Sequence, residues 1–159
     1  MHATYQDSGE LFGGDREIDI EPGTKIAGLP QHTFKLSADW HANDKLTIGG
    51  TVIGTSSIVT QGNEDGKIAD GVSYDAKIKG YQLLNLHANY EASKGLDYFA
   101  RINNVFDTRF ESYGMMAMSM FNANGSLIDS GISTTGPNVS RFVAPGAPRN
   151  FMVGLRYRF

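Results

Sequence analysis

The chain contains no cysteine in its 159 residues, so disulfide bonds and thiolate metal sites are excluded. It has no run of about 18 apolar residues, which excludes a transmembrane helix. Charged residues make up 19% of the chain, below the roughly 25% of ordinary soluble domains. The formal net charge is −3 and no basic stripe is present, so we expect no nucleic-acid partner.

Sequence motifs of common enzymes are also absent. There is no Gly-x-Ser-x-Gly elbow, no His-Glu-x-x-His pair and no phosphate-binding loop. The 4 histidines lack the spacing of metal ligands. We therefore expect no enzyme activity, no cofactor and no metal site. Residues 1–5 lack the charged and apolar regions of a secretory signal, so an exported protein would require a longer parent chain.

Glycine and aromatic residues are abundant, with 19 glycines, 9 phenylalanines and 7 tyrosines. Several segments alternate apolar and polar residues with a period of two, as the residues of a β-strand with one apolar face do. These segments are residues 31–41, 45–60, 81–92, 96–110 and 149–159. Residues 2–7 resemble the end of a further strand. The pattern predicts an all-β chain.

The alternation is clearest in residues 149–159. One face of this segment is apolar or aromatic and consists of Phe151, Val153, Leu155, Tyr157 and Phe159. The opposite face is mostly polar, with Asn150, Arg156 and Arg158. A strand of about ten residues with one apolar face is typical of the wall of an outer-membrane barrel.

The connections between the predicted strands alternate in length. Long connections cover residues 8–30, 61–80 and 111–148, whereas short turns lie at Asn43-Asp44 and at 93–95. Outer-membrane barrels have short periplasmic turns and long extracellular loops. The sequence therefore predicts an antiparallel meander that forms part of a transmembrane β-barrel, with about five strands plus an N-terminal stub.

Several motifs resemble those of TonB-dependent outer-membrane receptors. The run Asn103, Asn104, Val105, Phe106, Asp107 looks like the penultimate-strand motif of this family, with Val105 where leucine is usual. Residues 146–151 and 154–159 resemble the C-terminal signature of the family.

Two further segments extend the resemblance toward the N-terminus. Residues 28–32, Gly-Leu-Pro-Gln-His, are similar to a Gly-Val-Pro-Arg-His segment, and residues 80–86 resemble a strand opening. The resemblance implies a barrel of about 22 strands with an N-terminal plug. Such a receptor imports a scarce nutrient, for example a ferric siderophore or cobalamin, with energy from the inner-membrane TonB complex.

Residues 1–159 resemble only the C-terminal segment of such a barrel, without the plug. We expect this segment to form a curved open sheet and to be incapable of transport alone. The implied location is the outer membrane of a Gram-negative bacterium. The implied partners are outer-membrane lipid, the rest of the parent barrel and its plug, the TonB complex through the missing N-terminal part, and the barrel-assembly machinery.

The alternation also assigns side chains to faces and roles. The resemblance makes Phe151, Val153, Leu155, Tyr157 and Phe159 the signal read by the barrel-assembly machinery. Aromatic residues predicted to face lipid are Phe34, Trp40, Tyr90, Tyr98, Tyr157 and Phe159. Polar residues predicted to face the lumen or plug are Lys35, Asp39, Asn85, His87, Arg101, Arg156 and Arg158.

The connection 111–148 holds a candidate ligand loop. Its residues of interest are Tyr113, Met115, Met116, Met118, Met120 and Phe121. Methionine thioethers bind soft metals such as Cu(I), and they also contact apolar ligands. The same side chains fill irregular gaps in packing, which favours a structural role over the barrel mouth.

Two other functional classes remain open at this point. A soluble β-sandwich that binds a ligand would have the same alternation, with its apolar face against a second sheet, and would be extracted without detergent. A barrel enzyme would require a Ser–His pair at the barrel rim.

Overall fold

The computed structural model describes residues 3–7, 16–20, 25–61, 77–118, 121, 126 and 139–159. These residues form eleven strands, and none of them is helical. Within this described part, no helix has the length and apolar character needed to span a bilayer. The chain divides into two compact units, which are formed by interleaved stretches of sequence.

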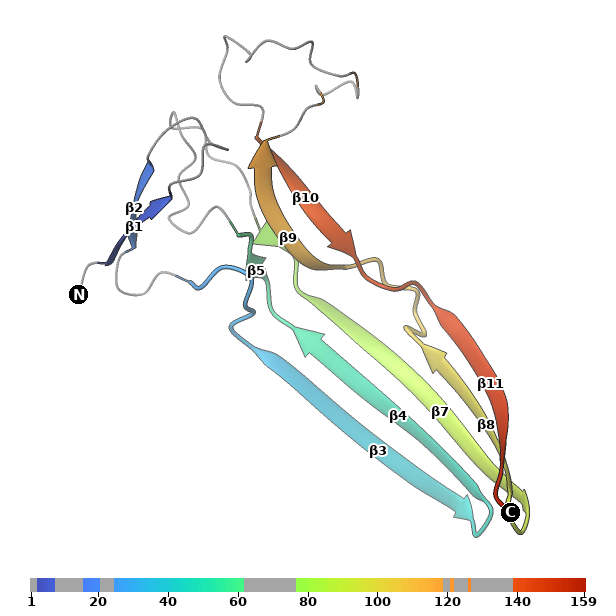
Figure 1. Cartoon of the computed structure of the whole chain (residues 1–159). Coiled ribbons are helices and arrows are strands. Elements are labelled where there is room, and N and C mark those ends of the chain that lie inside the picture. The colour runs from blue at the N-terminus through green and yellow to red at the C-terminus, as the bar shows by residue number, and fades with distance from the viewer. Residues whose placement is uncertain are drawn as a thin grey trace. The chain divides into compact units, whose positions relative to one another are not determined.

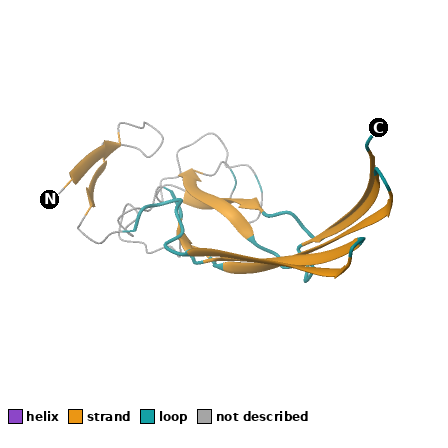
Figure 2. Ribbon diagram, turned by 90° about the horizontal axis from the view of Figure 1, so that it is seen from below, coloured by secondary structure: helices purple, strands orange, loops and turns teal. Residues whose placement is uncertain are grey.

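One unit is an antiparallel sheet of five strands in the order β11-β8-β7-β4-β3 (Figure 1). Its strands are β3 (Thr33–Asn43), β4 (Leu46–Thr55), β7 (Tyr81–Ser93), β8 (Leu96–Asn103) and β11 (Asn150–Tyr157). Strands that follow one another within this unit are neighbours in the sheet, so the predicted all-β antiparallel meander is confirmed. The sheet is curved and open, as expected from the sequence (Figure 2).

The local sequence stabilises the two tight turns of this sheet. Between β3 and β4, the Oδ1 atom of Asn43 accepts hydrogen bonds from the backbone N–H groups of Lys45 and Leu46, both at 2.9 Å. Between β7 and β8, Gly95 has a φ of 86°, which glycine adopts without steric strain. The pairing register shifts beside each turn, between His41 and Asn43 and between Glu91 and Ser93.

The other unit contains three two-stranded sheets. β1 (Ala3–Asp7) pairs with β2 (Arg16–Ile20), β5 (Ile58–Val59) with β6 (Lys77–Ile78), and β9 (Glu111–Met118) with β10 (Val139–Pro145). Its described apolar core consists of Ile58, Ile78 and Met116, which are at most 5% exposed. The backbone of Gln61 bonds to Gly114 and Met116, so β9 lies beside the end of the β5 segment.

Several element boundaries differ from the sequence prediction. Segment 96–110 is a strand only as far as Asn103, and segment 45–60 is interrupted at residues 56–57. The long connections, predicted as loops, contain β2, β6, β9 and β10. β6 has only two residues, and β9 and β10 lack a regular apolar alternation, so periodicity could not mark them.

Candidate functional site

The register of the five-stranded sheet places its apolar residues on one face. Trp40, Ile48, Ala88, Ala100 and Val153 are successive cross-strand partners in one row of this face. Trp40 is 65% exposed and Val153 is 82% exposed. The aromatic residues of the five strands that were predicted to face lipid all lie on this face. A continuous exposed apolar surface of this kind marks a site of contact with another protein or with a membrane.

The opposite face carries a polar row across the same strands. Asp39, Gly49, His87, Arg101 and Met152 are successive register partners. The Nε2 atom of His87 lies 3.1 Å from Oδ1 of Asp39, so the two side chains meet above Gly49. A Cβ atom at Gly49 would lie 2.0 Å from Asp39 Oδ1 and 2.5 Å from His87 Cε1. The contact therefore requires glycine between the two side chains.

Phe99 lies on this polar face, where it interrupts the alternation of its strand. Its ring covers Gly154, because a Cβ atom on Gly154 would lie 2.5 Å from Cζ of Phe99. An aromatic side chain over a strand glycine shields the exposed backbone and restores packing on that face. The guanidinium carbon of Arg101 lies 5.8 Å from the centroid of the Phe99 ring.

The predicted family motif lies at the end of β8, where Asn104 is the centre of a hydrogen-bonded corner. This residue is 4% exposed and has a φ of 52°. Its backbone N–H donates to Oδ1 of Asn85 at 2.9 Å, and its own Oδ1 accepts from the N–H of Thr108 at 2.8 Å. Its Nδ2 donates to the carbonyl oxygens of Thr108 and Ala147, at 2.9 and 3.1 Å. One asparagine thus joins three separate segments.

The same corner holds the start of β11. The Oδ1 atom of Asp107, whose φ is 53°, accepts a hydrogen bond from the N–H of Arg149 at 2.9 Å. Asn103 Nδ2 donates to Asn150 Oδ1, also at 2.9 Å. The corner cluster consists of Asn85, Asn103, Asn104, Asp107, Thr108, Ala147, Arg149 and Asn150. Phe106 of the motif is 74% exposed and is not part of the cluster.

The sequence placed Asn85 on the polar face and Arg149 in the C-terminal signature, but it predicted no contact of either residue, or of Thr108, with the family motif. These three residues lie 4 to 42 residues from their partners along the chain. The one local hint is the pair of Asn104 and Asp107, because Asn and Asp are the non-glycine residues most tolerant of positive φ.

The predicted assembly signal lies along β11, one of the two edge strands of the sheet. Phe151, Val153, Leu155 and Tyr157 are all more than half exposed on the apolar face. The ring of Phe159 meets that of Tyr157 edge to face, with centroids 5.1 Å apart. Beside it, Arg158 pairs with Asp97 at 2.7 Å, and its N–H donates to the carbonyl of Gly95. These contacts hold the last residues against the β7–β8 turn.

The candidate ligand residues differ in how far their side chains are exposed. Met116 is 3% exposed and packs in the small core, whereas Met115 and Tyr113 are both 41% exposed. The hydroxyl of Tyr113 bonds to Oε1 of Gln61, and Phe121 is exposed. The side chain of Met118 and the whole of Met120 lie outside the described residues. Among the described residues, no cluster of histidine and acidic side chains could hold a metal ion.

Comparison with protein families gives one family for this chain. The model of the TonB-dependent receptor-like β-barrel matches residues 2–105, which is more than half of the 159 residues. A comparison with curated proteins found no match.

Solved structures of siderophore receptors share the fold. The siderophore receptor PiuA from Acinetobacter baumannii is 14% identical over 97% of this chain, with a TM-score of 0.63. The ferric-catecholate import receptor Fiu from E. coli is 23% identical over 82% of it, with a TM-score of 0.54. The ferripyoverdine receptor of Pseudomonas aeruginosa is 22% identical over 90%, with a TM-score of 0.54.

This chain covers only 16 to 17% of the length of those three receptors. The structures show the fold, and the family model adds the sequence relationship, so the resemblance drawn from the motifs is confirmed. The β-sandwich alternative is not supported, because the matching folds are barrels. The chain belongs to the β-barrel family of TonB-dependent receptors, which are transporters of the Gram-negative outer membrane and not enzymes.

Proposed function

We propose that this chain is part of the barrel wall of a receptor for TonB-dependent uptake of a scarce nutrient. The observation that carries this proposal is the five-stranded sheet with one continuous apolar face. Within the described residues, β3 and β11 each pair along one edge only. Hydrocarbon offers no hydrogen-bond partners, so these edges need further strands of a closed barrel.

The proposed partners follow from the surfaces of the sheet. The apolar face contacts outer-membrane lipid, the rest of the parent barrel pairs with the two edges, and the plug faces the row of Asp39 and His87. The TonB complex acts through an N-terminal part of the receptor, and the barrel-assembly machinery reads the aromatic strand β11. The chain alone is not competent for transport, since even an eight-stranded barrel encloses only side chains.

A ferric siderophore is the nutrient that best fits the comparisons, ahead of cobalamin. The receptors with matching folds are described as siderophore, ferric-catecholate and ferripyoverdine receptors. In this chain, the exposed residues Tyr113, Met115 and Phe121 offer apolar and aromatic contacts to such a ligand. Met116 is buried in the small apolar core and does not offer such a contact.

We expect loss of this segment to abolish TonB-dependent iron uptake by its receptor. In the native host under iron limitation, deletion of the codons for residues 139–159 removes β10 and β11 and opens the barrel. Uptake of ⁵⁵Fe-loaded siderophores should then fall to the level of a strain without TonB. Unchanged uptake of all siderophores and of cobalamin, with the product in the soluble fraction, would contradict the proposal.

A further inference from the structure

The described parts of the three long connections meet in one compact unit, although they come from separate stretches of sequence. The N–H group of Gly28, in the first connection, donates to the carbonyl of Val59 at 2.8 Å. In the second connection, the N–H of Gln61 donates to the carbonyl of Gly114 at 3.2 Å. In the third, the N–H of Met116 donates to the carbonyl of Gln61 at 2.8 Å. We call residues 28, 58–61, 77–78, 111–118 and 139–144 the loop junction.

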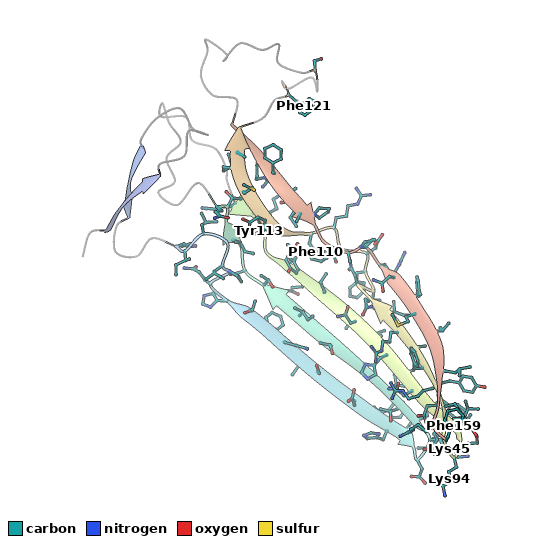
Figure 3. The ribbon with its side chains drawn as sticks, in the orientation of Figure 1. Lys45, Lys94, Phe110, Tyr113, Phe121 and Phe159 are labelled. Atoms are coloured by element: carbon teal, nitrogen blue, oxygen red, sulfur yellow. The ribbon has the colours of Figure 1, made fainter. Side chains whose placement is uncertain are left out.

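Close packing between β9 and the β5–β6 pair accompanies these hydrogen bonds. Met116 is 3% exposed, and a Cβ atom on Gly114 would lie 3.0 Å from Cδ1 of Ile78. The alternate residues of β9 lie on its other face. Of these, Tyr113, labelled in Figure 3, and Met115 are both 41% exposed. One face of β9 therefore packs in the loop junction, while the other is exposed.

One arginine joins the third connection to the second by its side chain. Arg141 of β10 donates from Nη1 to the carbonyl of Lys77 in β6 at 2.7 Å, and its Nη2 lies 3.5 Å from Oε1 of Glu111 in β9. The side chains of Arg141 and Glu111 are 37% and 32% exposed, so solvent screens their attraction only in part. A planar guanidinium group can contact both acceptors at once, whereas a lysine ammonium group is a single point of charge.

We propose that the loop junction opens and closes as one cooperative unit, and that Arg141 is the positioning residue that couples β9 and β10 to the β5–β6 pair. Segments that share hydrogen bonds and a core open together, and a unit with few buried residues opens easily. Among the described residues, this core is only Ile58, Ile78 and Met116.

The inference rests on the proposed barrel function, which places the long connections at the extracellular side of the membrane. A nutrient that contacts the exposed face of β9 would then stabilise all three connections together, including residues that it does not touch.

The test is hydrogen exchange in the complete receptor that carries this segment, held in mild detergent and resolved to single amides by mass spectrometry. The amides of Gly28, Gln61 and Met116 report on one connection each. In the wild type, their protection factors should agree within about threefold, because one opening exposes all three. Arg141→Gln should raise all three exchange rates by the same factor, about tenfold. Arg141 bonds to none of these amides, so a merely local role would not produce this result.

Arg141→Lys keeps the charge but cannot contact both acceptors, and it should raise the same three rates by about threefold. The control is Arg109→Gln, which removes an exposed arginine that forms no ion pair with the described residues. It should leave the three rates unchanged, and amides of β7 and β8 should keep their wild-type rates in every variant.

Unequal protection of the three amides in the wild type, or a rise confined to Met116 in the Arg141 variants, would overturn the coupling alone. A wild-type product that forms no heat-modifiable barrel would overturn the proposed function, whereas the agreement of the three exchange rates would still decide the coupling.

Discussion

Replacement of Asn104 by alanine is expected to lower the free energy of unfolding of the assembled receptor by about 3–5 kcal/mol. The substitution removes three side-chain hydrogen bonds from a position that is 4% exposed. It leaves polar groups of Thr108 and Ala147 without their partner at a part-buried corner. It also places a Cβ-bearing residue without a compensating side chain at positive φ.

The measurement is the denaturant midpoint of the barrel, followed by heat-modifiable migration in electrophoresis. Asn104→Gly should recover about 1 kcal/mol, because glycine removes the backbone strain but not the hydrogen-bond loss. Asn89→Ala is the matched control and should stay within about 0.5 kcal/mol of wild type. Asn89 lies on the polar face and forms no side-chain hydrogen bond with the described residues. Equal effects of Asn104→Ala and Asn89→Ala would contradict a stabilising corner.

The corner cluster also has a consequence for strand register. It joins the exit of β8 to the entry of β11 through Asn103–Asn150 and Asp107–Arg149. A slip of one residue between these strands would turn Val153 to the polar face and Arg156 to the apolar face. The family motif therefore serves, in this structure, to align the outermost strand with its neighbour.

The second large effect is expected from a charge in the middle of the apolar face. Val153→Lys places an ammonium group in hydrocarbon, which costs about 2–4 kcal/mol near the bilayer midplane. The amount of heat-modifiable receptor in outer membranes should fall severalfold. Val153 is 82% exposed and pairs with Ala100, so no existing packing is disturbed by the longer side chain.

Met152→Lys is the matched control for this substitution. Met152 is the preceding residue of β11 and lies on the polar face opposite Arg101. A lysine there contacts water or polar groups and should leave assembly near the wild-type level. Equal loss in both variants would show that the two faces do not differ in environment, and equal tolerance would show that neither face contacts lipid.

The sequence predicted those parts of the fold that depend on local pattern. Alternation alone placed Trp40, Tyr90 and Tyr98 on one face and Asp39, His87 and Arg101 on the other, because side chains in a strand alternate strictly. Phe99 broke the pattern in the sequence, and the register explains it, since its ring covers Gly154 of the neighbouring strand. Periodicity within one strand does not predict which residue of the neighbouring strand lies opposite, so this contact could not be predicted from the sequence.

The contacts that define the candidate site are not local and could not be predicted in the same way. Asn104 bonds to Ala147, 43 residues away, and Asp107 to Arg149, 42 residues away. The run Met115, Met116 likewise gave no sign that one side chain packs in a core while the other is exposed. These arrangements follow from which segments meet in three dimensions, and a single sequence holds that information only through a family motif.

A single-cysteine scan of β11 tests most directly whether alternate residues of this strand face lipid. The chain has no native cysteine, so residues 150–157 can be replaced one at a time and spin-labelled in the complete receptor within the membrane. Accessibility to membrane-dissolved oxygen should alternate, high at Phe151, Val153, Leu155 and Tyr157 and low at the residues between them. A uniform profile, or one with access to a water-soluble reagent at these four positions, would contradict a lipid-facing barrel wall.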